Sequence, residues 1–332
     1  MSSLVILLST LAVSTAQLGA PDRLITKHGV ELSADGRVFV LFAGLNGLGY
    51  SQETEHKGPP LSAPVFHELR EKAREAIRPL VADGKLEQLK KTFEGSPAEI
   101  DAYVALVLGL SNDFAKTDTP LPPEAETLAA AAGVFRTLSE DPDLQKIFDQ
   151  LAYEQRQFMK ALAAGITADF DKAAGSVAAG LTAPVSLTVI PNPLDAHGAV
   201  RRARVGSRSY LIVGPGEASA RRAVLEEALL GRLEQPVKDG LVKAPRLKKA
   251  YEGLAAGSKS VRAYGSVEVY AATTLARVLA FRALGGTEEE LIEREQQRGL
   301  AWVRSALRAT DAWKGGDPVP TEVAKALAKI AP

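Results

Sequence analysis

The stretch Ser209–Glu234, SYLIVGPGEASARRAVLEEALLGRLE, decides the fold. It opens with an apolar run ending in Ile212 and Val213, which is typical of a β-strand. Gly214-Pro215-Gly216 then turns the chain, and a helix is predicted over about 219–234. Apolar side chains recur in that helix at i, i+4 and i+8, with charged residues between them: Leu225, Leu229 and Leu233. The stretch therefore predicts a strand, a corner and an amphipathic helix in succession.

The chain changes character near Ala183. A second strand is predicted over 185–190, whereas helical spacing dominates the region before it. We therefore predict a predominantly helical α+β protein, with a mainly helical domain over 17–183 and a second domain with a small β-sheet over 184–332. Helices are expected at about 64–78, 96–110, 124–138, 142–174, 243–256, 262–284 and 287–309.

The segment Glu31–Phe42 is ambiguous. Asp35-Gly36 tolerates the backbone of a tight turn, so we predict two short strands around Ser33-Ala34-Asp35-Gly36. The apolar run Val38–Phe42 could instead open a buried helix, because periodicity does not separate the two for so short a run.

The N-terminus has the pattern of a secretory signal. Residues 1–20 carry no charged side chain, an apolar run begins at Leu4, and small residues follow at Ser14-Thr15-Ala16. We expect export to a periplasm or the extracellular medium after cleavage near Ala16, with residues 1–16 as the signal. A buried strand or an uncleaved anchor is the alternative. No later segment is apolar and long enough to cross a bilayer, so no membrane span is expected in the mature chain.

Composition limits the chemistry. The 332 residues include 40 Lys+Arg and 40 Asp+Glu, so there is no net charge to attract nucleic acid, and none is expected as a partner. The absence of cysteine excludes disulfides, thiolate metal sites and a cysteine nucleophile. Only four histidines remain for metal binding or acid–base work. His67 and Glu71 share a predicted helix face, but zinc needs a further protein ligand, so a solvated face is the preferred interpretation.

The order of elements from Pro191 onward resembles an exported bacterial family of zinc-metallopeptidase-like proteins of the gluzincin type, which use HExxH plus a downstream glutamate. Strand Ser209–Val213, the corner and helix Ala220–Glu234 look like that family's edge strand and active-site helix. Ser266-Val267-Glu268-Val269-Tyr270 looks like its glutamate helix. The segment Gly29-Val30-Glu31-Leu32 and the helices up to Gly175 resemble the helical domain before the site.

The motif itself is degenerate. On the resemblance, Glu227 matches the general base, Glu226 replaces the first histidine, Leu230 replaces the second, and Glu268 matches the third ligand. Leucine has no donor atom and no shifted alignment restores the pair, so zinc is predicted to be absent and no cofactor is expected. Two glutamates off an apolar stripe are equally well explained as exposed positions of an amphipathic helix.

We therefore predict a pseudoenzyme that binds a peptide or protein in the former cleft. The edge offered to an extended chain is predicted to be Tyr210, Leu211, Ile212 and Val213. The nearby basic residues Arg201, Arg202 and Arg204 favour an acidic partner, unless they form an exposed hairpin tip.

Two alternatives remain. One is a divergent metallohydrolase that draws His67 or His197 toward Glu227 and Glu268; the other is a structural, scaffold-type helical module. The sequence does not specify an oligomeric state.

Overall fold

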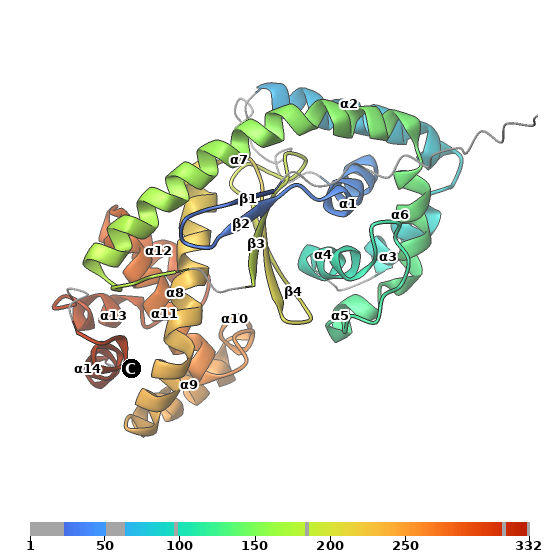
Figure 1. The fold of residues 1–332 in the computed structure, drawn as a ribbon. Helices are drawn as coiled ribbons and strands as arrows, with labels where there is room; N and C mark the ends of the chain where they lie inside the picture. Colours follow the sequence, from blue (N-terminus) through green and yellow to red (C-terminus); the bar gives the residue numbers. More distant parts are fainter. Residues whose placement is uncertain (1–22, 51–63, 96–98, 183–185, 314–316, 331–332) are drawn as a thin grey trace, which may run out of the picture.

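The computed structural model describes residues 23–50, 64–95, 99–182, 186–313 and 317–330, with the side chains of 64–67 excepted. The signal predicted over 1–16 lies outside this part of the chain. A five-stranded sheet forms the centre, in the order β1-β2-β3-β5-β4 (Figure 1). The strands are β1 (Arg23–Ile25), β2 (Glu31–Ser33), β3 (Leu187–Pro191), β4 (Val200–Val205) and β5 (Arg208–Val213).

Parallel pairing at the centre of the sheet joins distant parts of the chain. β2 pairs with β3, and β3 with β5, in parallel, whereas β1 and β4 run antiparallel to β2 and β5. The sheet thus combines two strands from before position 183 with three from after it. The domain division at that position stays a prediction, and 183–185 lie outside the described residues.

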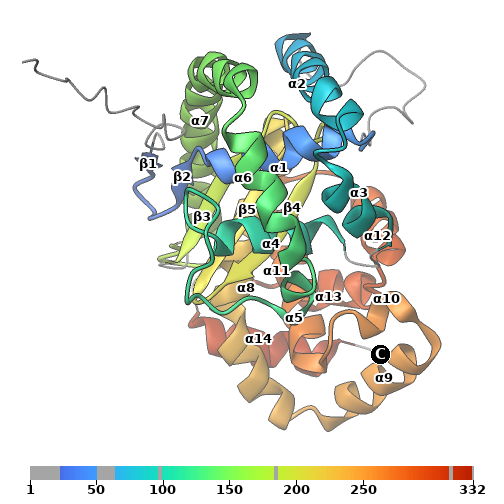
Figure 2. The ribbon, with the colours of Figure 1, turned by 90° about the vertical axis from the view of Figure 1, so that its right-hand side faces the viewer.

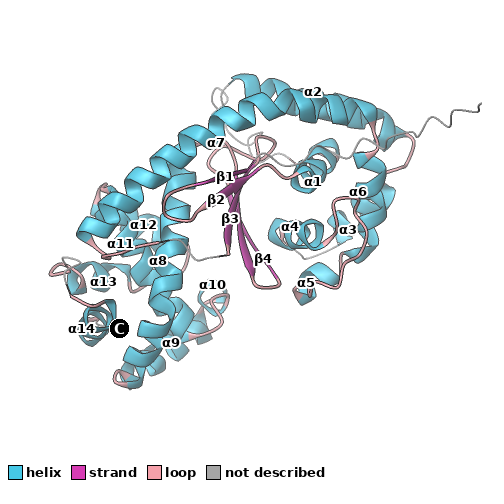
Figure 3. Cartoon of the chain, viewed as in Figure 1, coloured by secondary structure: helices cyan, strands magenta, loops and turns pink. Residues whose placement is uncertain are grey.

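Helices cover both faces of the sheet (Figure 3). Figure 2 shows α1 and α4 in front of one face, with α6 beside them. Side chains alternate along β5, so Ile212 packs into the core on the α1 and α4 side while Leu211 and Val213 join the core around α8 and α11. The first group is α1 (Gly36–Gly47), α2 (Pro64–Ala82), α3 (Glu87–Gly95), α4 (Ile100–Gly109), α5 (Pro123–Glu126) and α6 (Ala132–Ser139). The second is α8 (Glu217–Val242), α9 (Pro245–Gly257), α10 (Lys259–Arg262), α11 (Val267–Leu284), α12 (Glu288–Gln297), α13 (Val303–Ala309) and α14 (Val319–Lys329).

One long helix connects the two groups. α7 (Pro142–Ser176) arches over the sheet and contributes side chains to both cores. Asp141 caps its N-terminus, accepting hydrogen bonds from the amides of Asp143 and Leu144. The predominantly helical α+β fold predicted from the sequence is confirmed.

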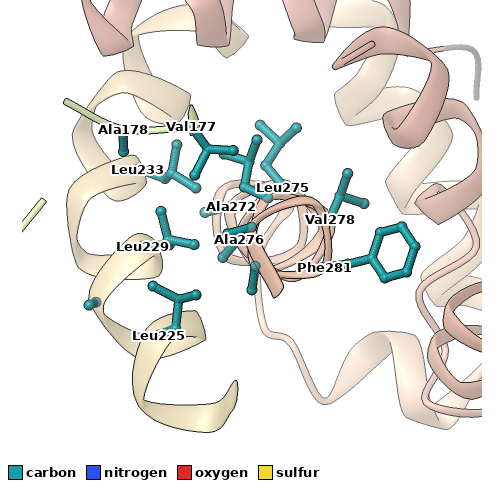
Figure 4. Close-up of a cluster of buried hydrophobic side chains, with 14 of the residues drawn as sticks. Val177, Ala178, Leu225, Leu229, Leu233, Ala272, Leu275, Ala276, Val278 and Phe281 are labelled. Atoms are coloured by element: carbon teal, nitrogen blue, oxygen red, sulfur yellow. The ribbon is translucent and has the colours of Figure 1, made fainter. Parts of the chain in front are cut away.

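Among the described helices, α8 and α11 share the most extensive contact, and the leucine stripe of α8 faces α11. Leu225, Leu229 and Leu233 point from α8 toward α11, where Ala272 and Leu275 meet them (Figure 4). All five side chains are almost fully buried. The predicted amphipathic helix is confirmed, although it continues through Pro236 to Val242 rather than ending near 234.

The hairpin predicted over Glu31–Phe42 is wrong. β2 ends at Ser33 and α1 begins at Gly36, so the apolar run Val38–Phe42 is helical and buried. The carboxylate of Asp35 accepts a hydrogen bond from the amide of Arg37 at 2.9 Å, which caps the helix. The turn residue Asp35 therefore starts a helix instead of joining two strands.

Further differences concern single elements. The basic segment around Arg201 forms strand β4, and β1, α3 and α14 were not predicted. The helix predicted over 287–309 is divided into α12 and α13. The helix predicted over 262–284 begins at Val267, after the separate turn α10. None of the described helices combines the length and the apolar character that a bilayer crossing requires.

Candidate functional site

The strand predicted as an open edge is internal. β5 lies between β3 and β4. The carbonyl of Val213 accepts from the amide of Asn192 beyond β3 at 2.8 Å, while the amide of Gly214 donates to the carbonyl of Ala199 before β4 at 2.9 Å. Along β5, the backbone groups of one residue therefore point toward β3 and those of the next residue point toward β4. The prediction that Tyr210, Leu211, Ile212 and Val213 offer a peptide-binding edge is wrong, because both sides of the strand are already paired.

β4 forms the edge of the sheet next to β5, and β1 forms the other edge. The amide of Arg202 points away from β5 and donates to a carboxylate oxygen of Asp101, on α4, at 3.2 Å. Antiparallel pairing alternates, so the backbone groups of Val200 and Arg204 point the same way. The side chains of Arg202 and Arg204 are exposed, whereas Ala203 between them is buried.

Arg201 serves a different purpose from its neighbours. Its guanidinium contacts the fully buried carboxylate of Asp195 at 3.2 Å and donates to the hydroxyl of Tyr50 at 2.5 Å. Burial and the nearby Asp195 carboxylate raise the pKa of Tyr50 well above its ordinary value. Arg201 therefore has a structural role inside the protein and is not available to a partner. The three arginines lie along strand β4 and do not form a hairpin tip.

A pocket of about 230 Å³ lies where β4 meets α8 and α11. Glu226, Glu227 and Leu230 line it, because positions i, i+1 and i+4 share one side of a helix. The structure thus brings together three of the four residues matched to the degenerate motif. The other lining residues are Arg202, Tyr264, Thr273, Ala276 and Arg277.

Both glutamates of the pocket have arginine partners. Glu226 Oε2 lies 3.7 Å from Arg202 Nη2 and 3.9 Å from Arg277 Nε. Glu227 Oε2 lies 3.4 Å from Arg202 Nε. Glu226 is buried, so its charge depends on these partners. The interpretation of Glu226 as an exposed helix position is wrong.

Glu268 does not join the pocket. It lies in the first turn of α11, whereas the pocket-lining residues of that helix are Thr273, Ala276 and Arg277. Its own backbone amide and the hydroxyl of Ser266 lower the pKa of Glu268, with a smaller contribution from lysines of α8 and α9. The carboxylate of Glu268 therefore interacts with the N-terminus of α11, and Glu268 does not share a site with Glu226 and Glu227.

The residues at the pocket do not fit a zinc ion, which needs three protein ligands in an open site. Across the described ranges, no group of three or more His, Asp or Glu side chains gathers in a way that could hold a metal. His197 lies in the loop after β3, close to the backbone of Gly216, and the side chain of His67 lies outside the described part. Whether the protein contains zinc stays a prediction.

The ion pairs continue from the pocket into the protein. Arg277 also pairs with the fully buried carboxylate of Glu295 on α12. Oε1 of that carboxylate accepts from Arg294 Nε at 2.7 Å and from Arg298 Nη1 at 3.4 Å. Burial by itself would raise the pKa of Glu295. The charge of Arg277 and the hydrogen bonds from Arg294 and Arg277 outweigh this effect of burial, so the pKa of Glu295 is lowered.

Tyr264 connects the pocket to this cluster. Its hydroxyl donates to the carbonyl of Arg298 at 3.1 Å, and its ring lines the pocket. Burial raises the pKa of Tyr264, so the hydroxyl stays protonated as a donor at neutral pH.

Sequence reasoning missed Tyr264, Arg277 and Glu295. One signal pointed to Arg277, since it is a lone charge in the middle of an otherwise apolar stretch of α11. A charge in such a position is expected to have a buried partner. The sequence did not indicate that this partner would be Glu295 on the following helix.

Comparisons with protein-family models, with curated proteins and with solved structures found no match. The gluzincin resemblance therefore rests on the sequence motifs quoted above.

Proposed function

We propose that this protein is a non-catalytic binding protein that recognises an extended, acidic segment of a peptide or protein along the outer edge of β4. The observation that carries the proposal is the outward-facing backbone of β4 beside the Glu226–Arg277 pocket. The gluzincin resemblance, with its degenerate motif, agrees with a site that binds without cleaving.

The backbone of β4 supports pairing with an added strand. Val200, Arg202 and Arg204 present amides and carbonyls away from β5. Within the described residues, the Asp101 carboxylate supplies the one hydrogen bond that reaches this edge from outside the sheet. An extended peptide would displace Asp101 and hydrogen-bond to these groups, as in other cases of strand addition.

The side chains of β4 favour acidic residues in the partner. Arg202 and Arg204 are exposed, and opposite charges at facing positions of paired strands stabilise the pairing. Arg204 makes no hydrogen bond or ion pair with the described residues. The pocket beneath Arg202 offers space for one side chain of the bound segment.

The Glu226 and Glu227 carboxylates favour recognition over catalysis. A general base needs a free carboxylate aimed at a proton, and both carboxylates are instead directed at arginines of the protein. Their arginine partners fix the positions of the charges that a bound side chain would meet.

A binding assay tests the proposal with the full chain and two fluorescent octapeptides, one of alternating Glu and Val and one of alternating Lys and Val. We expect the acidic peptide to bind and the basic one to bind at least about tenfold more weakly, since one charged contact is worth about 1.5–3 kcal/mol. Fluorescence anisotropy measures both affinities.

Two substitutions at one position separate backbone pairing from charge. Arg204→Pro removes an outward amide that makes no bond to β5, so the sheet tolerates it, and binding should be lost. Arg204→Gln keeps the amide and should weaken the acidic peptide only in part, while Arg304→Gln on α13 should bind as wild type. The proposal fails if neither peptide binds or if the Arg204→Pro variant binds like wild type. A short, charged edge would then serve only to prevent edge-to-edge association.

A further inference from the structure

A second pocket, of about 240 Å³, lies on the side of the sheet that α1 and α4 cover, next to the first turn of α1. Glu31 faces Thr188 in the pairing of β2 with β3, and Thr188 faces Tyr210 in the pairing of β3 with β5. Facing residues project from the same side of a sheet, so these three side chains form a polar row that lines the pocket. The row is polar although Ile190 and Ile212, on the same side of the sheet, belong to the hydrophobic core.

Two of the arginines that line this pocket are already neutralised. Arg23 donates to both carboxylate oxygens of Glu31, at 2.7 and 2.6 Å. Arg37 donates to both carboxylate oxygens of Asp35, at 3.1 and 2.6 Å, and to the backbone carbonyl of Leu110 at 2.6 Å. These bidentate pairs hold positive and negative charges in equal number at the pocket.

The third arginine, Arg208, has no such partner. It is exposed at the start of β5 and lines the pocket, and its guanidinium makes no hydrogen bond or ion pair with the described residues. Gly36, which begins α1, lies in the same lining. The first amides of a helix have no acceptor within the helix, and they favour a negative charge. One guanidinium and one helix N-terminus are therefore available to an anion.

The strongest indication of a ligand is a buried hydroxyl without a partner. Thr188 is 5% exposed, and its hydroxyl makes no hydrogen bond with the described residues. The hydroxyl of the half-buried Tyr210 beside it makes none either within the described ranges. An unpaired buried polar group costs free energy, and such groups are nearly always paired in folded proteins. Both hydroxyls are therefore free to bond to a molecule that enters the pocket.

We propose that this pocket binds a small hydroxycarboxylate. Its carboxylate pairs with Arg208 and the amide of Gly36, and its hydroxyl groups bond to Thr188 and Tyr210. A single negative charge fits, because Arg208 is the one unbalanced cation among the described residues of the lining, and the two carboxylates there repel a second charge. The volume is below the ~300–1,000 Å³ of sites for drug-sized ligands, so the ligand is small. The site is separate from the β4 edge and does not depend on peptide binding there.

Isothermal titration calorimetry of the full chain tests the site with three acids: lactate, glycerate and gluconate, as sodium salts. Each has a matched molecule that lacks one kind of group. Propionate lacks the hydroxyl of lactate, whereas glycerol and sorbitol lack the carboxylates of glycerate and gluconate. We expect at least one acid to bind. Its match should bind about fivefold more weakly without the hydroxyl, and at least about tenfold more weakly without the charge.

Variants locate the binding. Arg208→Gln removes the unpaired charge and should weaken the acid at least about tenfold. Thr188→Val has nearly the same shape and removes only the hydroxyl, so it should weaken the acid about fivefold; Tyr210→Phe serves if that variant does not fold. Arg304→Gln, an exposed arginine of α13, should bind the acid as wild type does.

Three results would overturn the proposal. The first is that none of the three acids binds. The second is that the matched molecule binds as tightly as its acid, since neither the charge nor the hydroxyl would then be recognised. The third is that Arg208→Gln and the hydroxyl variant both keep the wild-type affinity, which would place the acid elsewhere on the protein.

Discussion

Replacing Glu295 with glutamine should destabilise the protein strongly. The carboxylate is fully buried, and three arginines, Arg277, Arg294 and Arg298, contact its two oxygens. Glutamine has nearly the same shape, so the change removes the charge without leaving a cavity. The amide presents an N–H group where a guanidinium now donates, and it leaves the largely buried Arg277 without its nearest counterion.

The size of the loss follows from this geometry. Removing one partner of a buried ion pair costs about 3–5 kcal/mol, because the other charge remains buried without compensation. For a chain of this length, 1 kcal/mol corresponds to roughly 1.5 °C in Tm, so Tm should fall by about 4–8 °C. Arg298 is half-exposed and finds water instead, which places the expected loss in the free energy of unfolding toward the lower end of the range.

Urea denaturation at pH 7, followed by circular dichroism, measures the free energy of unfolding. Glu293→Gln is the matched control, since Glu293 is exposed on the same helix and should change stability by less than about 0.5 kcal/mol. A loss below about 1 kcal/mol for Glu295→Gln would refute the reasoning, since it would mean that the arginines around it do not need the carboxylate.

Three further outcomes are expected. The pKa of Glu295 is lower in the folded protein than its ordinary 4.5, so the stability that its charge contributes is fully present above that pH and is lost as the pH falls through the folded pKa. The urea midpoints of wild type and Glu295→Gln should therefore converge as the pH is lowered below 4.5. Leu229 is 1% exposed, so Leu229→Ala should lower the free energy of unfolding by about 2–5 kcal/mol. Leu230 is half-buried, so Leu230→Ala should lower the free energy of unfolding clearly less. Equal decreases in urea denaturation would contradict the packing shown in Figure 4. Gly214→Ala should lower Tm, because a Cβ there would lie 2.1 Å from the backbone carbonyl oxygen of Ala196 in the preceding loop. The control Gly253→Ala, at a position of helix α9 with open space around it, should raise Tm slightly. A Gly214→Ala protein as stable as wild type would contradict the close approach at Gly214.

Much of the local structure followed from the sequence. The strand–corner–helix stretch from Ser209 and the leucine stripe of α8 are confirmed. The leucine stripe has a clear helical period, and the apolar run before it is bounded by the turn residues Gly214-Pro215-Gly216. The run Val38–Phe42 was misjudged because five consecutive apolar residues have no period to read, and burial in α1 satisfies them as well as a strand would.

The candidate site was predictable only in part. Helical spacing alone places Glu226, Glu227 and Leu230 on one side of α8, so their gathering in one pocket could be predicted. Their arginine partners come from β4 and α11, and no local pattern indicates which distant charges meet. Glu268, expected at the same site, lies outside the pocket, because its position on α11 depends on where that helix begins.

The sequence by itself determined the fold class, most of the helices and the strand leading into α8, because these depend on the spacing of side chains along one segment. Only the tertiary structure decided which strand is open. Local reasoning predicted β5 as a strand and did not predict β4. The pairing of β5 with β3 on one side and with β4 on the other leaves β4 at one edge of the sheet, with β1 at the other. The tertiary structure also decided that Glu226 and Glu295 are ion-paired to arginines, since the free energy of a buried charge depends on neighbours that the chain brings from other elements.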